Sequence, residues 1–169
     1  DAVERTCGVR PGVKWTNDLI LDEKKLAGIL SELSVEWESG TLEYLVVGIG
    51  VNCGHSLEDF PEELREKATS LFLSTGQTPD RDRLTAELIL ALHRMSEELI
   101  SGKAQWMQRY REDSITLGRR VLVMRSGNVR SATATAIDES GALLVRYDTG
   151  ETGAVFSGEV SVRGEHGYI

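Results

Sequence analysis

Residues 14–30 read KWTNDLILDEKKLAGIL. Two short apolar runs, 19–21 and 26–30, flank a polar segment, and this pattern predicts a β-hairpin. Asp18 stands at the start of the first strand, and Lys25 stands at the start of the second. Because side chains alternate between the two faces of a strand, the length of the turn decides whether these two charges share a face.

A two-residue turn at Glu23–Lys24 places Asp18 and Lys25 on one face, whereas a three-residue turn separates them. In the two-residue register Leu21 pairs with Leu26, and Asp18 pairs with Ile29. We favour this register because it gathers a core-facing set on the opposite face: Leu19, Leu21, Leu26 and Leu30. The charged face, with the amide of Asn17, suits a polar anionic ligand. The alternative is a surface hairpin whose charges are solvated.

A second stretch, residues 45–52, reads LVVGIGVN and predicts a buried strand interrupted by Gly48 and Gly50. Glycine weakens a strand and often marks a place where a ligand or another backbone comes close. The run is not a dinucleotide fingerprint, because Cys53 occupies the position of the third glycine. Asn52 supplies an amide at the strand end that can donate and accept hydrogen bonds. Close packing between layers is the alternative explanation for the two glycines.

Together these stretches resemble the central part of biotin protein ligases, which activate biotin with ATP and attach it to a lysine of a carrier protein. The family's pattern is KWPND, a short spacer, K-(I/L)-A-G-I-L, and then GIG-(I/V)-N. Thr16 replaces the proline of that pattern. Residues 137–145 and 157–163 are similar to the small C-terminal barrel of the same family. The resemblance therefore runs from about residue 10 to residue 163.

The resemblance implies a role for each candidate site residue. Joining a carboxylate to the α-phosphate of ATP brings two anions together, so the site needs a cation between them and usually a metal on the phosphates. Lys25 is implied to contact the biotin carboxylate and then the α-phosphate as biotinyl-5'-AMP forms, with Asp18 as the second catalytic residue. The implied substrate-binding residues are Asn17, Lys25, Gly28, Ile29, Gly48, Gly50 and Asn52, and the implied Mg²⁺ residues are Asp18 and Asn52.

The resemblance also implies an α+β fold of the class II aminoacyl-tRNA synthetase and biotin ligase type, truncated at the N-terminus. Such a fold has a mixed, largely antiparallel sheet with packed helices, followed by an SH3-like β-barrel. Apolar spacing predicts helices over 80–100 and 103–112. Five short strand patterns follow Gly118, at 120–124, 129–137, 142–147, 152–156 and 159–162. We therefore expect a catalytic portion at 1–116 and a barrel at 117–169.

The composition indicates a globular protein and limits the kinds of partner and location that we expect. The chain has 169 residues, 40% of them hydrophobic and 27% charged, which is typical of a globular protein. Its net charge of −8 argues against binding nucleic acid through bulk electrostatics. No run is apolar enough to cross a membrane. Cys7 and Cys53 have no metal-ligand spacing and suggest no disulfide scaffold, so the expected location is the cytoplasm.

One departure from the family pattern limits the expected activity. The family's glycine- and arginine-rich phosphate loop precedes the KWPND motif, and nothing before Lys14 matches it, Arg5 and Arg10 included. We therefore expect that this chain alone cannot make the adenylate efficiently. We also expect no helix-turn-helix repressor domain, which some members carry, within this chain. The expected partners are a biotin carrier protein, namely a carboxylase subunit, and a second copy in a homodimer. The alternatives are a lipoate-type ligase and a non-catalytic binding or dimerisation piece.

Overall fold

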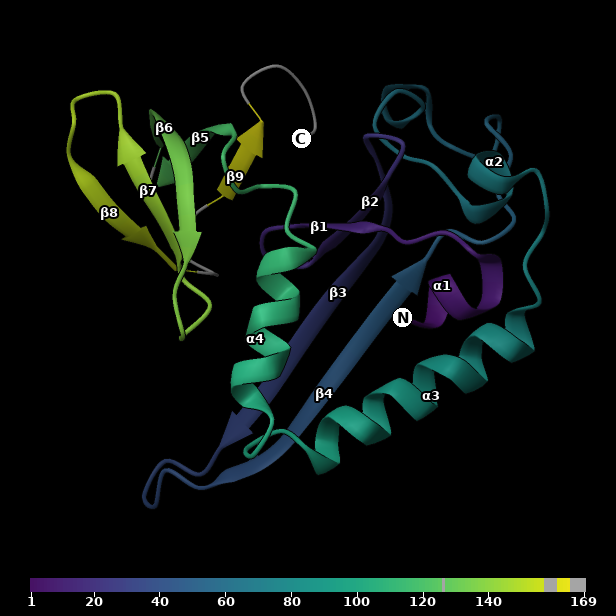
Figure 1. The fold of residues 1–169 in the computed structure, drawn as a ribbon, viewed down its shortest axis with the longest axis horizontal. Coiled ribbons are helices and arrows are strands. Elements are labelled where there is room, and N and C mark those ends of the chain that lie inside the picture. The colour runs from purple at the N-terminus through teal and green to yellow at the C-terminus, as the bar shows by residue number, and fades with distance from the viewer. Residues whose placement is uncertain (126, 157–160, 165–169) are drawn as a thin grey trace.

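The computed structural model describes residues 1–125, 127–156 and 161–164. Over these residues it contains two antiparallel sheets and four α-helices (Figure 1). The first sheet has the order β1-β2-β3-β4, and the second has the order β8-β7-β6-β5-β9. The predicted α+β class with largely antiparallel sheets is confirmed. Among these residues no helix is long and apolar enough to cross a bilayer.

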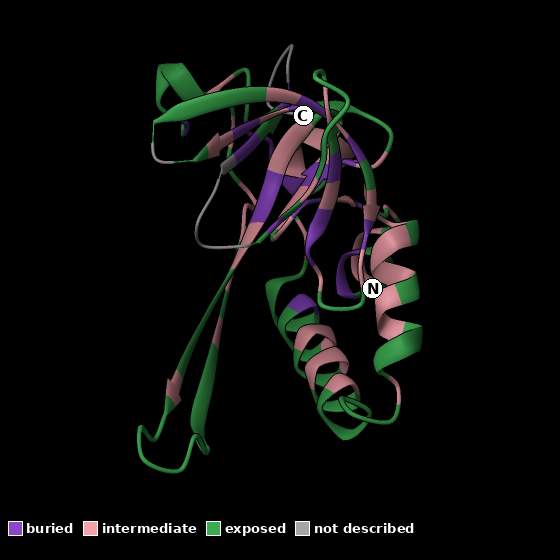
Figure 2. Cartoon of the chain, turned by 90° about the vertical axis from the view of Figure 1, so that its left-hand side faces the viewer, coloured by how far each residue is buried: buried purple, intermediate pink, exposed green. Residues whose placement is uncertain are grey.

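The first sheet is built from consecutive antiparallel neighbours: β1 (Gly12–Lys14), β2 (Asp18–Leu21), β3 (Lys24–Val35) and β4 (Leu42–Val51). The distal halves of β3 and β4 extend away from the rest of the fold as a long, exposed hairpin (Figure 2). The sequence predicts this return at Glu38-Ser39-Gly40, and the structure turns there. The predicted burial of the strand over 45–52 is wrong, because Leu45 and Val46 are 50% and 53% exposed on this hairpin.

Four helices accompany this sheet: α1 (Ala2–Cys7), α2 (Leu71–Thr75), α3 (Arg81–Glu97) and α4 (Lys103–Glu112). The Asp80 carboxylate accepts hydrogen bonds from the N–H groups of Asp82 and Arg83, which explains why α3 begins where it does. Between β4 and α3 the chain forms a loop with a short 3₁₀ turn, η1 (Glu62–Leu64), and α2. The main helix predictions are thus confirmed to within a few residues.

A compact apolar cluster joins α1 and α3 to one face of the first sheet. It contains Ala2, Val3, Leu26, Ala27, Leu71 and Leu84. Leu26 and Leu71 are fully buried, so the segment after β4 is fastened directly to the base of the hairpin.

The second sheet comprises β5 (Arg120–Arg125), β6 (Asn128–Ile137), β7 (Leu143–Tyr147), β8 (Thr152–Val155) and β9 (Ser161–Gly164). It encloses the larger core cluster: Trp15, Val121, Val123, Ala132, Ala134, Ile137, Leu143, Val145, Val155 and Val162. Four of the five predicted strands match closely. The predicted fifth strand begins at Glu159, and residues 159–160 lie outside the described residues. Since β8 and β9 are the outer strands, closure into a barrel stays a prediction.

The predicted turn of the β2–β3 hairpin is wrong by one residue. The turn lies at Asp22–Glu23, where φ is 51° and 62°, instead of at Glu23–Lys24. Positive φ at both central positions is the requirement of the type I′ turn, one of the two hairpin turns that suit strand twist, and Asp tolerates this conformation better than most residues. Starting the turn at Asp22 meets that requirement and pairs Leu21 with Lys24.

The predicted core position of Leu30 is also wrong, since Leu30 is 63% exposed. The register shifts between Leu19 and Ile20, so that Ile20 faces Lys25 whereas Asp18 faces Gly28 rather than Ile29. One extra residue on β3 reverses the side-chain alternation beyond it. Leu30 therefore shares the face of Gly28, away from the buried Leu26.

Candidate functional site

An open groove lies on one face of the first sheet, at the base of the β3–β4 hairpin. Its floor is formed where Gly28 pairs with Gly50 and Leu30 pairs with Gly48. The lining residues are Asn17, Asp18, Lys25, Gly28, Ile29, Leu30, Gly48, Ile49 and Gly50. All but one of the predicted site residues therefore meet in one place, the exception being Asn52.

Lys25 and Asp18 form an ion pair over the glycine floor. The Lys25 Nζ atom is 2.6 Å from the Asp18 Oδ1 atom. The predicted meeting of these two charges is thus confirmed. The Lys25 side chain is 40% exposed and that of Asp18 is 18% exposed, so the ammonium is the more accessible partner.

Gly28 lies directly beneath this pair. A Cβ atom added there would be 3.3 Å from Lys25 Nζ and 3.5 Å from Asp18 Oδ1. The contact with Lys25 Nζ is tighter than usual and that with Asp18 is an ordinary van der Waals contact, so a side chain at position 28 would press mainly on the Lys25 ammonium. Gly48 and Gly50 have more room, because an added Cβ would meet only a backbone carbonyl, at 3.6 Å and 3.9 Å respectively.

Asn17 holds the preceding turn against β3. Its Nδ2 group donates to the Ile29 carbonyl at 2.5 Å, and the Ile29 N–H donates to the Asn17 carbonyl at 2.9 Å. Asn17 therefore fixes the wall of the groove through reciprocal bonds.

Asn52 is placed differently. Its side-chain Nδ2 group donates to the Thr69 carbonyl at 3.0 Å, and its backbone carbonyl accepts from the Leu71 N–H at 2.9 Å. These bonds fasten the segment before α2 to the end of β4, outside the lining of the groove. The predicted ligand role of Asn52 stays a prediction.

The turn that carries Asn17 and Asp18 is anchored to the second sheet and to α4. Trp15 is buried, and its Nε1 group donates to the Gly141 carbonyl at 2.9 Å. The Tyr110 hydroxyl donates to the Thr16 carbonyl at 2.9 Å. Burial raises the pKa of Tyr110 to about 12, so this phenol keeps its proton at neutral pH.

Lys14 lies next to the groove, and the sequence motifs alone do not assign it a role. It is 7% exposed and stands directly opposite Asp18 in the β1–β2 pair. Burial lowers the pKa of Lys14, and the negative charge of Asp18 opposes that shift. The signal that could have found it is a charged residue within a strand, immediately before a buried tryptophan.

The groove offers few ligands for a metal. Among the described residues there is no cluster of three or more His, Cys, Asp or Glu side chains suited to a metal ion. Asp18 is the acidic side chain among the lining residues that the structure describes. Magnesium is often held by one or two carboxylates together with substrate phosphates and water, so a lone Asp18 fits such an arrangement only with a phosphate ligand present.

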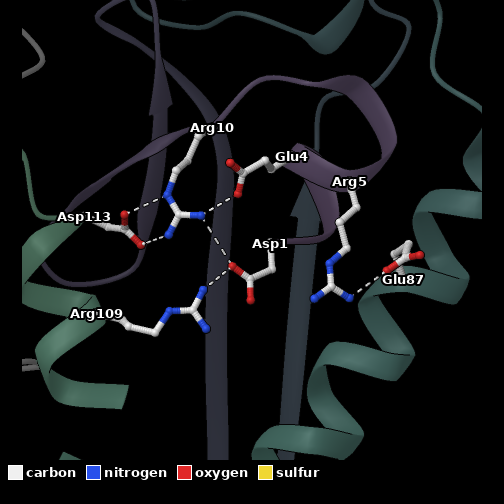
Figure 3. A network of polar contacts seen from close by, with 7 residues as sticks. All are labelled: Asp1, Glu4, Arg5, Arg10, Glu87, Arg109 and Asp113. Atoms are coloured by element: carbon white, nitrogen blue, oxygen red, sulfur yellow. Dashed lines mark hydrogen bonds and ion pairs between the residues drawn. The ribbon is translucent and has the colours of Figure 1, made fainter. Parts of the chain in front are cut away.

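A separate cavity lies between α1, α3 and α4, and three of its lining arginines, Arg5, Arg10 and Arg109, pair with acidic side chains (Figure 3). Arg10 binds Asp113 through two hydrogen bonds of 2.9 Å and 2.7 Å, and it also donates to Glu4 at 2.5 Å. Arg109 donates to Asp1 at 2.5 Å, and Arg5 pairs with Glu87 at 3.3 Å. This network ties α1 to α3 and to the end of α4, and we assign it a structural role.

Comparisons with known proteins agree with this geometry. The model of the Biotin/lipoate A/B protein ligase family matches residues 8–52, which include every lining residue of the groove. The model of the Biotin protein ligase C terminal domain matches residues 116–163. The chain belongs to the biotin protein ligase family. Membership confirms the resemblance that the KWTND, KLAGIL and GIGVN motifs indicate.

Relatives in this family align over most of the chain. It is 32% identical over 164 residues to the biotin--[acetyl-CoA-carboxylase] ligase of Mycobacterium tuberculosis, covering 95% of this chain and 57% of that protein. It is 27% identical over 149 residues to the bifunctional ligase/repressor BirA of Bacillus subtilis, covering 88% of this chain and 45% of that protein. The chain thus spans about half the length of the curated relatives it matches.

A solved family member supports the fold. The biotin protein ligase from Aquifex aeolicus in complex with biotin and ATP aligns with a TM-score of 0.75 and 29% identity, covering 96% of this chain and 66% of that chain.

Proposed function

We propose that this chain is part of an ATP-dependent biotin–protein ligase and that its groove is where the biotin carboxylate meets ATP. The observation that carries the proposal is the Lys25–Asp18 pair, set over a glycine floor within the segment that the family model matches. The naming of relatives as biotin ligases, and the binding of biotin and ATP by the Aquifex protein, support it.

In the first step a carboxylate oxygen of biotin attacks the α-phosphorus of ATP. A new O–P bond forms biotinyl-5'-AMP, and the bond to pyrophosphate breaks. Both reactants are anions, so the Lys25 ammonium lies where their repulsion is greatest. At an effective dielectric constant near 20, one such charge pair about 4 Å apart contributes roughly 4 kcal/mol, enough to matter for the rate.

In the second step the neutral amine of a carrier lysine attacks the acyl carbon, an amide bond forms, AMP leaves, and the amine proton passes to solvent. Asp18 attracts the incoming lysine while it is still an ammonium ion. Holding the two reactants together supplies much of the remaining acceleration.

The open floor lets phosphate and acyl groups approach the backbone. In this proposal Gly28, Ile29, Gly48 and Gly50 contact the ligand, with Asn17 holding the wall and Asn52 at the phosphate end. Asp18, with phosphate oxygens, would hold Mg²⁺, which supplies further neutralisation of phosphate charge.

The same proposal includes four further expectations. They are a biotin carrier protein as partner, a homodimer, a cytoplasmic location, and a domain boundary between residues 116 and 117.

A lipoate-type ligase is the second candidate, because the model that matches residues 8–52 describes biotin and lipoate ligases together. The match of residues 116–163 to a domain of biotin protein ligases favours biotin.

The test is transfer of radiolabelled biotin to a carrier domain by the natural full-length protein. We expect Lys25→Ala to lower transfer by roughly 100-fold, as loss of a preorganised charge does in other acyl-transfer sites. Lys24→Ala is the matched control, since the Lys24 Nζ group donates to the Arg65 carbonyl outside the groove. Undiminished transfer by Lys25→Ala would remove Lys25 from the mechanism.

Labelled lipoate in a parallel assay separates the two ligase candidates. Transfer of lipoate in preference to biotin would redirect the assignment. Transfer of neither acid would favour a non-catalytic binding or dimerisation role.

A further inference from the structure

Lys14 is a buried ammonium next to the groove that the proposed chemistry does not use. Its exposed fraction is 7%, and lysine is rarely so buried without a compensating charge. It ends β1, and its register partner across the β1–β2 pair is Asp18. Directly opposed residues in an antiparallel pair project from the same face, about 5 Å apart at their Cβ atoms. The Asp18 carboxylate therefore has Lys14 on one flank.

Lys25 occupies the other flank, with its Nζ atom 2.6 Å from Asp18 Oδ1. One carboxylate thus faces two ammonium groups, and the local charge is positive. Arg163 of β9 adds to the positive field at Lys14. The two lysines differ in freedom, because Lys14 is enclosed by the fold whereas the Lys25 side chain is 40% exposed.

This asymmetry matters when a ligand arrives. An anion that draws Lys25 away would leave Asp18, whose side chain is only 18% exposed, without a counter-charge unless another cation were present. Leaving a largely buried charge without a counter-charge raises the free energy of the folded protein. Lys14 removes that cost because it stays beside Asp18.

We propose that Lys14 is a positioning residue that keeps the Asp18 carboxylate paired when Lys25 turns to an anionic ligand. The inference rests on the proposed function only in taking the ligand of Lys25 to be an anion. Lys14 itself does not touch the ligand.

The test measures binding of inorganic pyrophosphate, in metal-free buffer and without biotin, to the ¹⁵N-labelled chain. The readout is the shift of the Gly28 and Gly50 amide signals. In Lys14→Met, Lys25 is the remaining lysine beside Asp18, so we expect the affinity to fall about tenfold. Lys24→Met makes the same change in net charge at a distance from the groove and should stay within about twofold of the wild type.

A second substitution distinguishes positioning from packing. Asp18→Asn added to Lys14→Met removes the charge that holds Lys25, and we expect the affinity to return to within about threefold of the wild type. Damage to packing would not be repaired by that change. Lys14→Gln, with and without Asp18→Asn, is measured in parallel so that the result does not depend on how Met packs.

Three outcomes overturn the proposal: wild-type affinity in both Lys14 variants, a loss that Asp18→Asn does not restore, or no pyrophosphate binding by the wild-type chain. Failure of biotin transfer in the ligation assay is a separate result, because no biotin enters this experiment. Conversely, if Lys25→Ala abolishes pyrophosphate binding and the Lys14 variants do not weaken it, the groove keeps its proposed function and Lys14 loses its role.

Discussion

Gly28 shows how the groove depends on the absence of a side chain at a single residue. The ion pair lies tightly against the space that a side chain at position 28 would enter, with Lys25 Cε 3.4 Å and Lys25 Nζ 3.3 Å from an added Cβ atom. The glycine is needed for room, because its own backbone is not in the positive-φ region. A small change at this position should therefore act on charge geometry more than on folding.

We predict that Gly28→Ala displaces the Lys25 ammonium and lowers biotin transfer by about tenfold, while the free energy of unfolding changes by less than about 1 kcal/mol. Transfer assays and urea unfolding check both parts. Gly48→Ala is the matched comparison, because its Cβ atom would meet the Leu30 carbonyl at an ordinary 3.6 Å and leave the ion pair intact. Structures of both variants should differ in the Lys25–Asp18 distance, and equal distances would contradict the prediction.

The meeting of Asp18 and Lys25 was predictable from sequence even though the turn was misplaced. A two-residue turn keeps the two side chains on one face whether it lies at 22–23 or at 23–24. The position of Leu30 was not predictable, because it depends on a register shift that no local pattern in residues 14–30 signals. The charge placed before Trp15 could single out Lys14 in the sequence, but its burial depends on tertiary packing and was not predictable.

The β2–β3 turn holds two non-glycine residues in a conformation that favours glycine. Asp22 and Glu23 both have positive φ, which costs a residue with a side chain more than it costs glycine. We predict that Asp22→Asn with Glu23→Gly stabilises the chain by about 1 kcal/mol, since Asn-Gly is the preferred pair for this turn.

Urea unfolding measures this gain. Glu32→Gly in the exposed part of β3 is the control, because glycine there meets only the cost of ordering and should destabilise the chain by roughly 0.5–1 kcal/mol. A turn variant that loses as much stability as Glu32→Gly would show that positive φ is not the source of strain.

Helices and strands differed in how far the sequence could define them. The bounds of α3 and α4 follow from apolar spacing and the Asp80 cap, all within one segment. Strand limits in the second sheet follow from turn residues, so they were also predictable to within a few positions. The pairing of strands that are distant in sequence depends on contacts across the whole chain. Closure of the second sheet into a barrel between β8 and β9 therefore stays a prediction.

For the whole molecule, Trp15 is the residue through which the groove and the second sheet depend on each other. It precedes Asn17 and Asp18 by two and three positions, yet its side chain belongs to the core of the second sheet, with Met107 and Tyr110 of α4 packed against that core. A sequence pattern could indicate that Trp15 is buried. It could not indicate that the burial lies in the sheet that begins 105 residues later, at Arg120.

We predict that Trp15→Phe lowers the free energy of unfolding by about 1 kcal/mol, because the ring remains apolar while the hydrogen bond to the Gly141 carbonyl is lost. Trp15→Ala should cost roughly 3–5 kcal/mol and also weaken pyrophosphate binding, since the turn that presents Asp18 loses its anchor. Trp37, which is 97% exposed at the far end of the hairpin, supplies matched controls, and its Phe and Ala variants should each stay within about 0.5 kcal/mol of the wild type. Urea unfolding and the amide shifts of Gly28 provide the two measurements. If Trp15→Ala destabilises the chain but leaves pyrophosphate binding unchanged, the groove does not depend on the second sheet through this side chain.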